Sequence, residues 1–501
     1  MCGGVSGARW FRHECARPLR NAHPGARSAK GSPVSAALIE ALRACVGAAN
    51  VLQGDGLSAY EVDWRKRWRG QALAVVRPGT TDEVAAVVRR CAANTTPVVA
   101  QGGNTGLVGA GVPDGSGSQV LLSLARLNRI REIDRANLTL TAEAGCVLQA
   151  VQQAAADADL LFPLSLAAEG SCTIGGNLAT NAGGTQVLRY GNARALCLGL
   201  EAVTAAGEVW HGLAGLRKDN TGYDLRDLLI GSEGTLAIIT AATLALHPRP
   251  VATMTALAAC ASLDDCVALL AAAQRRLGPG LTGFEVMNQF SLALVARHFP
   301  KLRQPLPSGP WTVLVELSDN EGEAHARAQF EGLLADALEA GPITDAAVAE
   351  SVAQSRAMWH LRESIPLAQS EEGLNIKHDI ALPVSRIPAF CATTDAALAT
   401  RWPGMRLVNF GHLGDGNLHY NVQAPEGHDA AAFLRDEEHA VNAVVFDAVI
   451  DHGGSISAEH GIGALKRDEL VLRKDPTALA MMRAVKTALD PQGLLNPGRV
   501  L

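Results

Sequence analysis

The pattern of apolar and polar positions predicts alternating strands and helices in the early part of the chain. Residues 72–78 form an apolar run that ends at a proline, which is typical of a short strand. Residues 81–88 open with a threonine and two acids and continue with apolar positions at helical spacing, so we expect a capped amphipathic helix. Residues 97–100 predict a buried strand, and residues 36–42 predict an earlier helix.

The same pattern continues further along the chain. Residues 200–209 alternate like two strands joined through a glycine turn, and residues 230–239 lead through a glycine turn into a β-branched strand. Residues 310–317 predict another strand, and residues 440–451 predict a helix that two glycines end. Between these groups, the run Pro-Arg-Pro at 248–250 indicates a domain boundary.

Composition places the chain among globular enzymes. Its 501 residues suffice for two or three domains, and 48% hydrophobic with 19% charged residues excludes wholesale disorder. A net charge of −6 provides no basic field for nucleic acid. The ten cysteines contain no C-x-x-C pair, so we expect reduced thiols in a cytosol-like compartment. The most apolar stretch, 251–273, contains two aspartates, so we expect no transmembrane segment.

Residues 1–36 differ from the rest of the chain, because six basic residues stand there against a single acid, Glu14. An arginine-rich, acid-poor start resembles an organelle transit peptide, which would place the protein in the mitochondrial matrix. Two simpler interpretations are a disordered tail and a start codon placed too early. The alanine- and arginine-heavy composition favours a bacterial, cytoplasmic protein. The sequence leaves open whether these residues are real, processed or disordered.

Residues 409–421 read N-F-G-H-L-G-D-G-N-L-H-Y-N and place two histidines around a turn. Glycine and asparagine at 414–417 tolerate positive φ, so we expect a hairpin with a four-residue loop. His412 would then lie directly opposite His419, with Cβ atoms about 4.5–5.5 Å apart. Two imidazoles so placed can share one metal ion. Asn421, two residues beyond His419, would point to the same face.

A second cluster, S-A-E-H-G-I-G at 457–463, puts a carboxylate beside an imidazole. His412, His419 and Glu459 would form a set of two histidines and one carboxylate with an open position, which is the pattern of a catalytic metal site. His460 would remain as a general base. Zinc is favoured over manganese or iron, and the identity of the metal stays open. The alternative is a surface hairpin with two partly exposed histidines.

Three glycine-rich runs point to an extended ligand. They are Q-G-G-N-T-G-L-V-G at 101–109, E-G-S-C-T-I-G-G-N-L-A-T-N-A-G-G at 169–184, and I-G-S-E-G-T-L-A-I-I at 230–239. The first run follows a predicted strand, so its backbone N–H groups are free to cradle phosphate. Two long glycine runs place backbone close against a flat ligand. The pattern is not G-x-G-x-x-G and no βαβ unit with a downstream acid follows, which excludes a Rossmann nicotinamide site.

These runs resemble the FAD-binding domain of the vanillyl-alcohol oxidase superfamily, the PCMH-type domain. The histidine hairpin and S-A-E-H-G-I-G resemble its D-2-hydroxyacid dehydrogenase branch, whose members act on D-2-hydroxyglutarate, D-lactate or glycolate. The resemblance implies an α+β fold with a PCMH-type FAD-binding domain at 37–248. It further implies an α+β cap or substrate domain at 249–488, with a central antiparallel sheet and the metal site. Residues 489–501 would return to the FAD domain.

The resemblance also implies which residues bind FAD. The first run would hold the diphosphate, the second would line the flavin, and Ile239 would contact the adenosine part. The expected FAD-binding residues are Gly102, Gly103, Asn104, Thr105, Gly106, Pro163, Gly170, Cys172, Thr173, Gly175, Gly176, Asn177, Thr180, Ala182, Gly183, Glu233, Gly234, Ile239 and Asn496. Some relatives attach FAD to a histidine in the first run. Residues 101–109 contain none, so we expect FAD to bind without a covalent bond.

The implied reaction is oxidation of a D-2-hydroxyacid to the 2-oxoacid, with D-2-hydroxyglutarate as the leading substrate and D-lactate as an alternative. The α-hydrogen would leave as hydride to flavin N5. His460 would take the hydroxyl proton, and the metal would lower the hydroxyl pKa. Arg362 and Lys377 match family positions that hold substrate carboxylates, and Asn421 is a further contact. A threonine that some hydroxyglutarate enzymes use is Pro366 here, which leaves the chain length of the substrate open.

Two interpretations from other classes compete with this one. The same histidines and glutamate could build a metallohydrolase, but a hydrolase needs no glycine-rich platform. A non-catalytic FAD-binding subunit would have lost His460 or the metal ligands, and all are present here. The expected electron acceptor is an electron-transfer flavoprotein or a quinone. The oligomeric state stays open, with a homodimer as one option.

Overall fold

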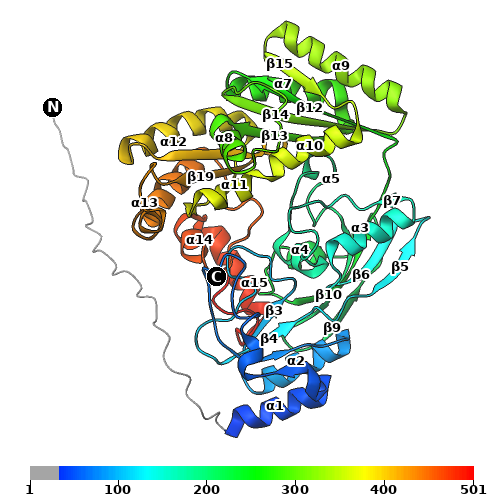
Figure 1. Ribbon diagram of the computed structural model, residues 1–501. Helices are drawn as coiled ribbons and strands as arrows, with labels where there is room; N and C mark the ends of the chain where they lie inside the picture. The colour runs from blue at the N-terminus through cyan, green and yellow to red at the C-terminus, as the bar shows by residue number, and fades with distance from the viewer. Residues whose placement is uncertain (1–32) are drawn as a thin grey trace, which may run out of the picture.

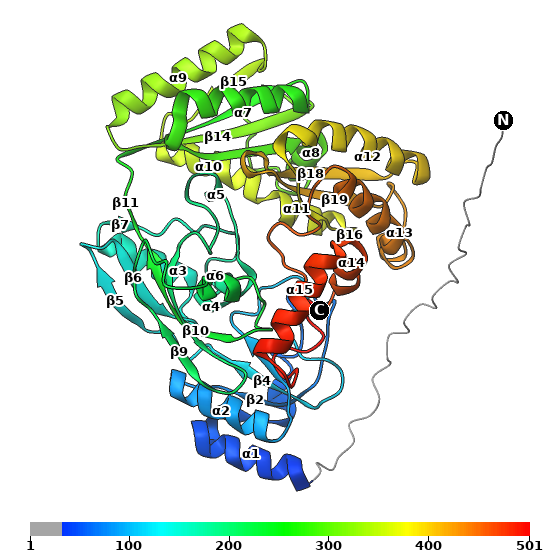
Figure 2. The ribbon, with the colours of Figure 1, turned by 180° about the vertical axis from the view of Figure 1, so that it is seen from behind.

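A computed structural model describes residues 33–501 as two α+β halves joined by extended chain (Figure 1, Figure 2). An extension was expected at residues 1–36. Residues 1–32 of it lie outside the described residues. The first half is blue to green in Figure 1, and the second half runs from green to orange. The red C-terminal helices lie beside the blue strands of the first half in both views.

The smaller sheet of the first half leads into the first glycine-rich run. Its strand order is β1 (Val51–Leu52), β2 (Ala72–Val76), β4 (Gln119–Ser123) and β3 (Val98–Gln101), and all but β1 are parallel. Helix α2 (Thr81–Ala93) packs on this sheet, and α1 (Pro33–Val46) packs against α2. The Thr80 hydroxyl caps α2 by accepting a hydrogen bond of 3.1 Å from the Glu83 N–H. The predicted strand, helix and strand are thus confirmed.

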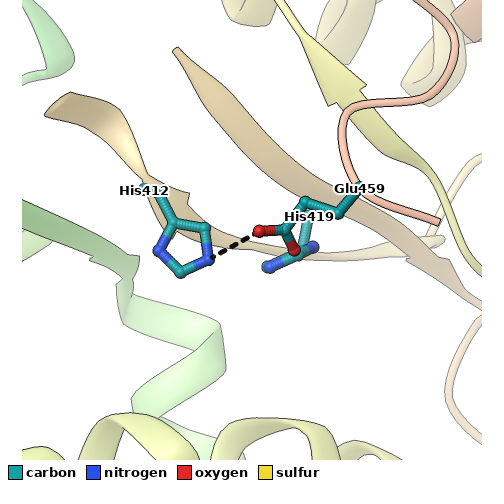
Figure 3. A group of neighbouring side chains, drawn as sticks. All are labelled: His412, His419 and Glu459. Atoms are coloured by element: carbon teal, nitrogen blue, oxygen red, sulfur yellow. Dashed lines mark ion pairs between the residues drawn. The ribbon is translucent and has the colours of Figure 1, made fainter. Parts of the chain in front are cut away.

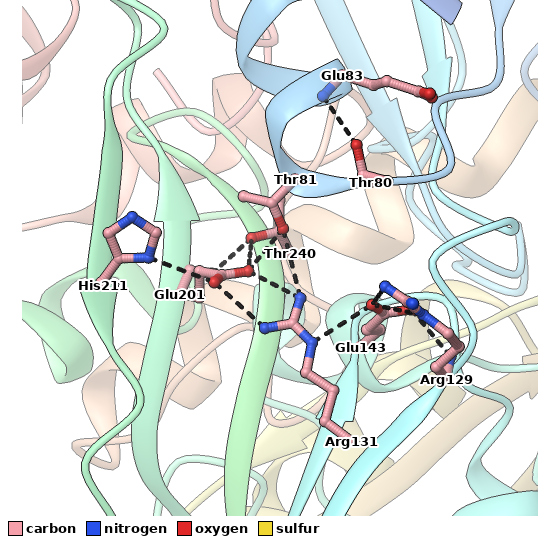
Figure 4. Close-up of polar contacts among 9 residues, drawn as sticks. All are labelled: Thr80, Thr81, Glu83, Arg129, Arg131, Glu143, Glu201, His211 and Thr240. Atoms are coloured by element: carbon pink, nitrogen blue, oxygen red, sulfur yellow. Dashed lines mark hydrogen bonds and ion pairs between the residues drawn. The ribbon is translucent and has the colours of Figure 1, made fainter.

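The second sheet of the first half is antiparallel. Its strand order is β5 (Ile130–Asp134), β6 (Thr139–Glu143), β10 (Ile238–Ala245), β8 (Cys197–Val203) and β9 (Val209–Gly212). A buried network links it to α2 (Figure 4). Arg131 lies between the carboxylates of Glu143 and Glu201, at 3.3 and 3.1 Å, and Thr81 donates a hydrogen bond of 2.6 Å to Glu201. Because buried carboxylates are costly unless paired, this network holds α2 against the second sheet.

Short elements connect these sheets. They are α3 (Leu148–Asp157), β7 (Leu160–Leu161), α4 (Ile174–Thr180), α5 (Val187–Tyr190), α6 (Leu225–Leu229) and β11 (His247–Pro248), which pairs with β7. The second glycine-rich run is therefore not loop throughout, since its middle forms α4. Asn181 ends α4 in the left-handed conformation with φ of 52°, which turns the chain into Ala182 and Gly183.

The second half is built on a central antiparallel sheet, as predicted. Its strand order is β15 (Asp345–Val348), β12 (Ala252–Cys260), β14 (Trp311–Asp319), β13 (Leu281–Asn288), β18 (Arg406–His412), β19 (Asn417–Gln423) and β16 (Asn375–Ile376), and β17 (Asp379–Ala381) also pairs with β19. The strand predicted at 310–317 is β14.

Both faces of this sheet are covered by helices. One apolar face packs on α7 (Leu263–Leu277), α9 (Glu323–Ala340), α12 (Ile387–Arg401) and α13 (Ala430–Asp451). The other packs on α8 (Gln289–His298), α10 (Val352–Glu363) and α11 (Ile365–Glu372). The helix predicted at 440–451 is α13, which begins earlier because Asp429 caps its N-terminus. Beyond β13, the second face carries buried polar side chains of β18 and β19.

The chain crosses back to the first half after α13. The N–H of Gly463 donates a hydrogen bond of 2.8 Å to Glu233, and α14 (Arg467–Arg473) and α15 (Pro476–Leu489) follow. Lys486 of α15 donates a hydrogen bond of 2.7 Å to the Thr235 carbonyl. Residues 494–496 then pair with Val98 at the edge of β3. No helix within residues 33–501 has both the length and the apolar character needed to span a bilayer.

Candidate active site between the two halves

A cleft in the first half brings the three glycine-rich runs together. It encloses about 930 Å³ of space, counting its open side. The expected ligand-binding residues that line it are Gly102, Gly103, Asn104, Thr105, Gly106, Cys172, Thr173, Gly175, Gly176, Asn177, Thr180, Glu233, Gly234 and Ile239. Asp63 also lines the cleft, although it belongs to none of the glycine-rich runs.

Glycine is required where the runs pack on one another. A Cβ on Gly103 would lie 2.0 Å from the carbonyl oxygen of Ser171, and a Cβ on Gly175 would lie 2.6 Å from the Ala144 Cβ. By contrast, a Cβ on Gly106 would meet no atom within 4 Å, because Gly106 faces the open cleft. The first and second runs are therefore held in direct backbone contact, and the open side is left for a ligand.

Five of the expected ligand-binding residues lie outside the lining of this cleft. Pro163 is buried, and Gly170 is exposed. The Asn496 amide donates hydrogen bonds to the carbonyls of Ala110 and Glu233, at 3.0 and 2.7 Å. Ala182 and Gly183 follow α4 and lead out of the cleft. Gly183 instead adjoins Glu459, since a Cβ on it would lie 2.4 Å from that carboxylate.

The histidine hairpin forms with a different register from the one predicted. His419 lies opposite Phe410 and not opposite His412, because residues 413–415 coil into a 3₁₀ turn and Gly411 has a φ of 152°. The shift is by two positions along β18, so His412 stays on the same face of the sheet, as a diagonal neighbour of His419. Their ring centroids are 5.5 Å apart.

Glu459 completes the cluster with the two histidines (Figure 3). Its Oε1 lies 3.9 Å from Nε2 of His412, and one ligand atom from each of the three residues lies within 4.8 Å of the others. The second ring nitrogen of His412, Nδ1, pairs with Glu285 at 2.6 Å. This hydrogen bond leaves Nε2 directed at the cluster.

Glu285 of β13 was not predicted from the sequence. Burial alone would raise the pKa of its carboxyl, but the charges of Arg362 and His412 and their hydrogen bonds bring that pKa down to about 2. Arg362 Nε donates to the second oxygen of Glu285 at 2.8 Å. Nη2 of Arg362 is buried and has no hydrogen-bond partner among the described residues. The free end of the guanidinium therefore fits an anionic ligand.

Asp379 is the second residue that sequence reasoning missed. Its Oδ2 accepts hydrogen bonds of 2.8 Å from the backbone N–H groups of both Glu459 and His460. Its carboxylate also lies 3.8 Å from His419 and 3.7 Å from His460. The run N-I-K-H-D at 375–379 contains Asp379, but only Lys377 of that run was singled out. Asp379 positions the whole segment that carries Glu459 and His460.

His460, Lys377 and Asn421 lie around the same face. Burial lowers the pKa of His460 to about 4, although Asp379 opposes this effect, so its imidazole is neutral at pH 7. The pairing of both β16 and β17 with β19 places Lys377 across from Asn421. The amide of Asn421 is engaged internally, since it donates to Gln369 at 3.1 Å and accepts from the His378 N–H at 3.0 Å.

Comparisons with known proteins identify the family. Residues 72–212 match the FAD binding domain family, and residues 249–500 match the C-terminal domain of FAD linked oxidases. D-2-hydroxyglutarate dehydrogenase of Xanthomonas citri is 40% identical over 447 residues, which cover 89% of this chain and 92% of that protein. The mitochondrial enzyme of that name from Rattus norvegicus is 38% identical, over 89% of this chain and 81% of its own length. The chain belongs to the FAD-linked oxidase family.

Solved structures show that this FAD-linked oxidase has the PCMH-type fold. p-Cresol methylhydroxylase superposes with a TM-score of 0.74 at 16% identity, over 94% of this chain and 98% of that chain. 4-Ethylphenol oxidase from Gulosibacter chungangensis superposes with a TM-score of 0.73 at 19% identity, over the same shares of the two chains. The fold class predicted from the glycine-rich runs is thus confirmed.

The glycine cleft of the FAD-linked oxidase fits FAD. Thr173 and Asn177 line the cleft, and Oγ1 of Thr173 and Nδ2 of Asn177 are buried without a hydrogen-bond partner in the described chain. Buried polar groups normally have partners, so these two atoms indicate a polar ligand within reach. The first run contributes backbone N–H groups suited to a diphosphate. Gly102 to Gly106 would hold that diphosphate, and residues of α4 would lie along the flavin.

Proposed function

We propose that this FAD-linked oxidase oxidises a D-2-hydroxyacid to the 2-oxoacid, with D-2-hydroxyglutarate as the leading substrate. The observation that carries the proposal is the contact between the end of the second glycine-rich run and the histidine–glutamate cluster. The Gly184 N–H donates a hydrogen bond of 2.6 Å to Glu459, and Glu233, which lines the cleft, accepts from the N–H groups of Ile462 and Gly463. The FAD cleft and the candidate catalytic residues therefore meet at one place.

His460 is the proposed general base. Its pKa of about 4 keeps it neutral, and a neutral imidazole can accept a proton. Because Nδ1 lies 3.7 Å from Asp379, Nε2 is the nitrogen that we assign to accept the hydroxyl proton of the substrate. The imidazolium that results would be stabilised by the Asp379 carboxylate, which is buried and whose pKa lies well below its usual range. FAD, when bound, supplies the acceptor for the two electrons and the α-hydrogen.

The cluster fits a divalent metal ion, and we propose zinc. Two imidazole nitrogens and one carboxylate oxygen lie within 4.8 Å of one another and would leave a coordination position open for substrate. When bound, such an ion supplies a Lewis acid that favours loss of the hydroxyl proton. Glu285 would orient His412, and the Gly184 N–H would orient Glu459.

Arg362 and Lys377 are the proposed binding residues for the negative charge of the substrate. The Nη2 atom of Arg362 lacks a partner within residues 33–501, and Lys377 has no side-chain hydrogen bond or ion pair with these residues. We further propose that FAD binds without a covalent bond, because residues 101–109 contain no histidine. The proposed acceptor of the electrons is an electron-transfer flavoprotein or a quinone. This part of the proposal is supported by the family membership alone.

Anaerobic flavin bleaching tests this function. Purified protein would be mixed with D-2-hydroxyglutarate, D-lactate, D-malate and their L-forms, before and after treatment with a chelator. We expect the D-form of one acid to bleach the flavin absorbance, the chelator to abolish bleaching, and added metal to restore it. Flavin that none of these acids bleaches would refute the proposal. Bleaching that a chelator leaves unchanged would refute the role of the metal.

A further inference from the structure

We propose that Arg65 binds a second carboxylate of the substrate, so that the site selects dicarboxylic 2-hydroxyacids. The inference rests on the proposed oxidation of a D-2-hydroxyacid and names the substrate class of that site. Arg65 belongs to the first half of the chain, whereas Arg362, Lys377 and His460 belong to the second. The second carboxylate would therefore be held by a residue from the opposite side of the interface.

Arg65 lies on a tight turn in front of β2. The turn closes by a bridge between Val62 and Arg69, and Oδ1 of Asp63 accepts a hydrogen bond of 2.6 Å from the Trp68 N–H. Lys66, next to Arg65, has a φ of 56°, which reverses the chain within the turn. The local backbone thus fixes the direction in which Arg65 leaves the chain.

This turn is anchored to both halves of the protein. On one side, Asp63 lines the FAD cleft, and the Val62 carbonyl accepts a hydrogen bond of 2.9 Å from Asn104. On the other side, Arg67 forms two parallel hydrogen bonds with Glu438 of α13, at 2.8 and 2.6 Å. Bidentate pairs of this kind fix geometry as well as distance. Arg65, between these anchors, is held at the interface.

Helix α13 places the turn beside Lys377. Asn442 stands one helical turn after Glu438, on the same face of α13. Its side-chain oxygen lies 2.9 Å from Nε2 of His378, the residue that follows Lys377. The turn of residues 62–70 and the edge strand with Lys377 are therefore bound to neighbouring positions of one helix.

Arg65 and Lys377 are cations that form no ion pair in the described part of the chain. Within residues 33–501, neither side chain has a hydrogen bond or an ion pair, although both are partly buried. Two carboxylates act on the charge of Arg65. Glu438 is paired with Arg67, and Asp63 accepts from the Trp68 N–H through Oδ1, while its buried Oδ2 has no hydrogen-bond partner in the described chain. Burial and the charge of Arg65 together lower the pKa of Lys377 to about 8. Their like charges repel, and an anion bound by both would offset that cost.

The position of these cations matches the second end of a dicarboxylic acid. Lys377 lies across from Asn421, two residues beyond His419 of the cluster, which places it beside the proposed metal site. Arg362 is linked to the cluster through Glu285 and His412. A substrate whose hydroxyl faces His460 would thus have one cationic group toward Arg362 and a pair of cations toward Lys377 and Arg65.

Substitution of Arg65 tests the proposal in the FAD-loaded protein. We would compare Arg65→Met with Lys66→Met, which removes the same charge from an exposed neighbour on the same turn. The substrates would be D-2-hydroxyglutarate and D-2-hydroxyvalerate, which has the same chain length without the second carboxylate. We expect Arg65→Met to raise the KM for hydroxyglutarate roughly 10- to 100-fold and to leave the KM for hydroxyvalerate and both kcat values within about twofold. Lys66→Met should change neither KM, and Arg65→Lys should restore part of the loss.

A binding measurement separates this proposal from the proposed function. Glutarate would be titrated into the oxidised protein and followed by the flavin difference spectrum, with flavin content and melting temperature matched between variants. We expect the Kd of glutarate to rise roughly 10-fold or more in Arg65→Met. Equal Kd values in wild type and Arg65→Met, or equal increases in KM for both acids, would overturn the role of Arg65. If the wild type oxidises neither acid, the proposed function fails, and the glutarate titration alone decides on Arg65.

Discussion

The backbone N–H of Gly184 donates a hydrogen bond of 2.6 Å to the side-chain carboxylate of Glu459, across 275 positions of sequence. A Cβ at the preceding residue, Gly183, would lie 2.4 Å from the same carboxylate, so glycine is needed for this approach. The end of the second glycine-rich run therefore positions a member of the histidine–glutamate cluster. This contact joins the second glycine-rich run directly to the cluster.

Replacing Glu459 by glutamine removes a charge and keeps an oxygen that can accept from the Gly184 N–H. We expect the metal affinity of Glu459→Gln to fall roughly 100-fold or more. This loss exceeds the one typical of residues that only orient the metal ligands. Flavin content should stay at the wild-type level, because the glycine cleft is unchanged. Metal analysis after dialysis, together with flavin absorbance, measures both quantities. Glu426→Gln, an exposed carboxylate of the same half, is the control, and equal metal content in the two variants would contradict the assignment.

The packing of the two glycine runs predicts a contrast between Gly103 and Gly115. An alanine Cβ at Gly103 would lie 2.0 Å from a backbone oxygen, whereas one at Gly115 would meet nothing within 4 Å. We expect Gly103→Ala to lower the free energy of unfolding by about 1–3 kcal/mol, as overpacked sites do, and to lose FAD during purification. Gly115→Ala should match the wild type in both. Thermal unfolding and the flavin-to-protein absorbance ratio report the outcome, and full retention of FAD by Gly103→Ala would show that the runs can separate.

The pKa of Lys377 predicts how substrate binding depends on pH. Burial, followed by the charge of Arg65, lowers this pKa to about 8, so the ammonium is present below pH 8 and is lost above it. The KM for D-2-hydroxyglutarate should therefore be low and constant below about pH 7.5 and should rise as the pH passes through 8. In Lys377→Arg, the charge persists to much higher pH, so the rise should disappear. Steady-state kinetics from pH 6.5 to 9.5 decide this, and superimposable profiles for the two proteins would exclude Lys377 as the titrating group.

Much of the fold could be predicted because it depends on contiguous residues. The apolar spacing of residues 72–100 determines β2, α2 and β3, and the glycine-rich runs determine where backbone packs closely. The turn residues 414–417 likewise encode a hairpin between His412 and His419. The register of that hairpin was predicted wrongly, because the 3₁₀ turn at 413–415 takes up residues that simple strand pairing would have used.

The sequence by itself determined the glycine cleft, the α+β fold and the residue types of the candidate cluster, since each is encoded within a short stretch of chain. Only the tertiary structure decided that Glu285 pairs with His412, that Asp379 holds the backbone of Glu459 and His460, and that Arg67 pairs with Glu438 of α13. These contacts join strands and turns that are far apart in sequence. Which side chains meet there depends on how two sheets and their covering helices pack, and local periodicity carries no record of that packing.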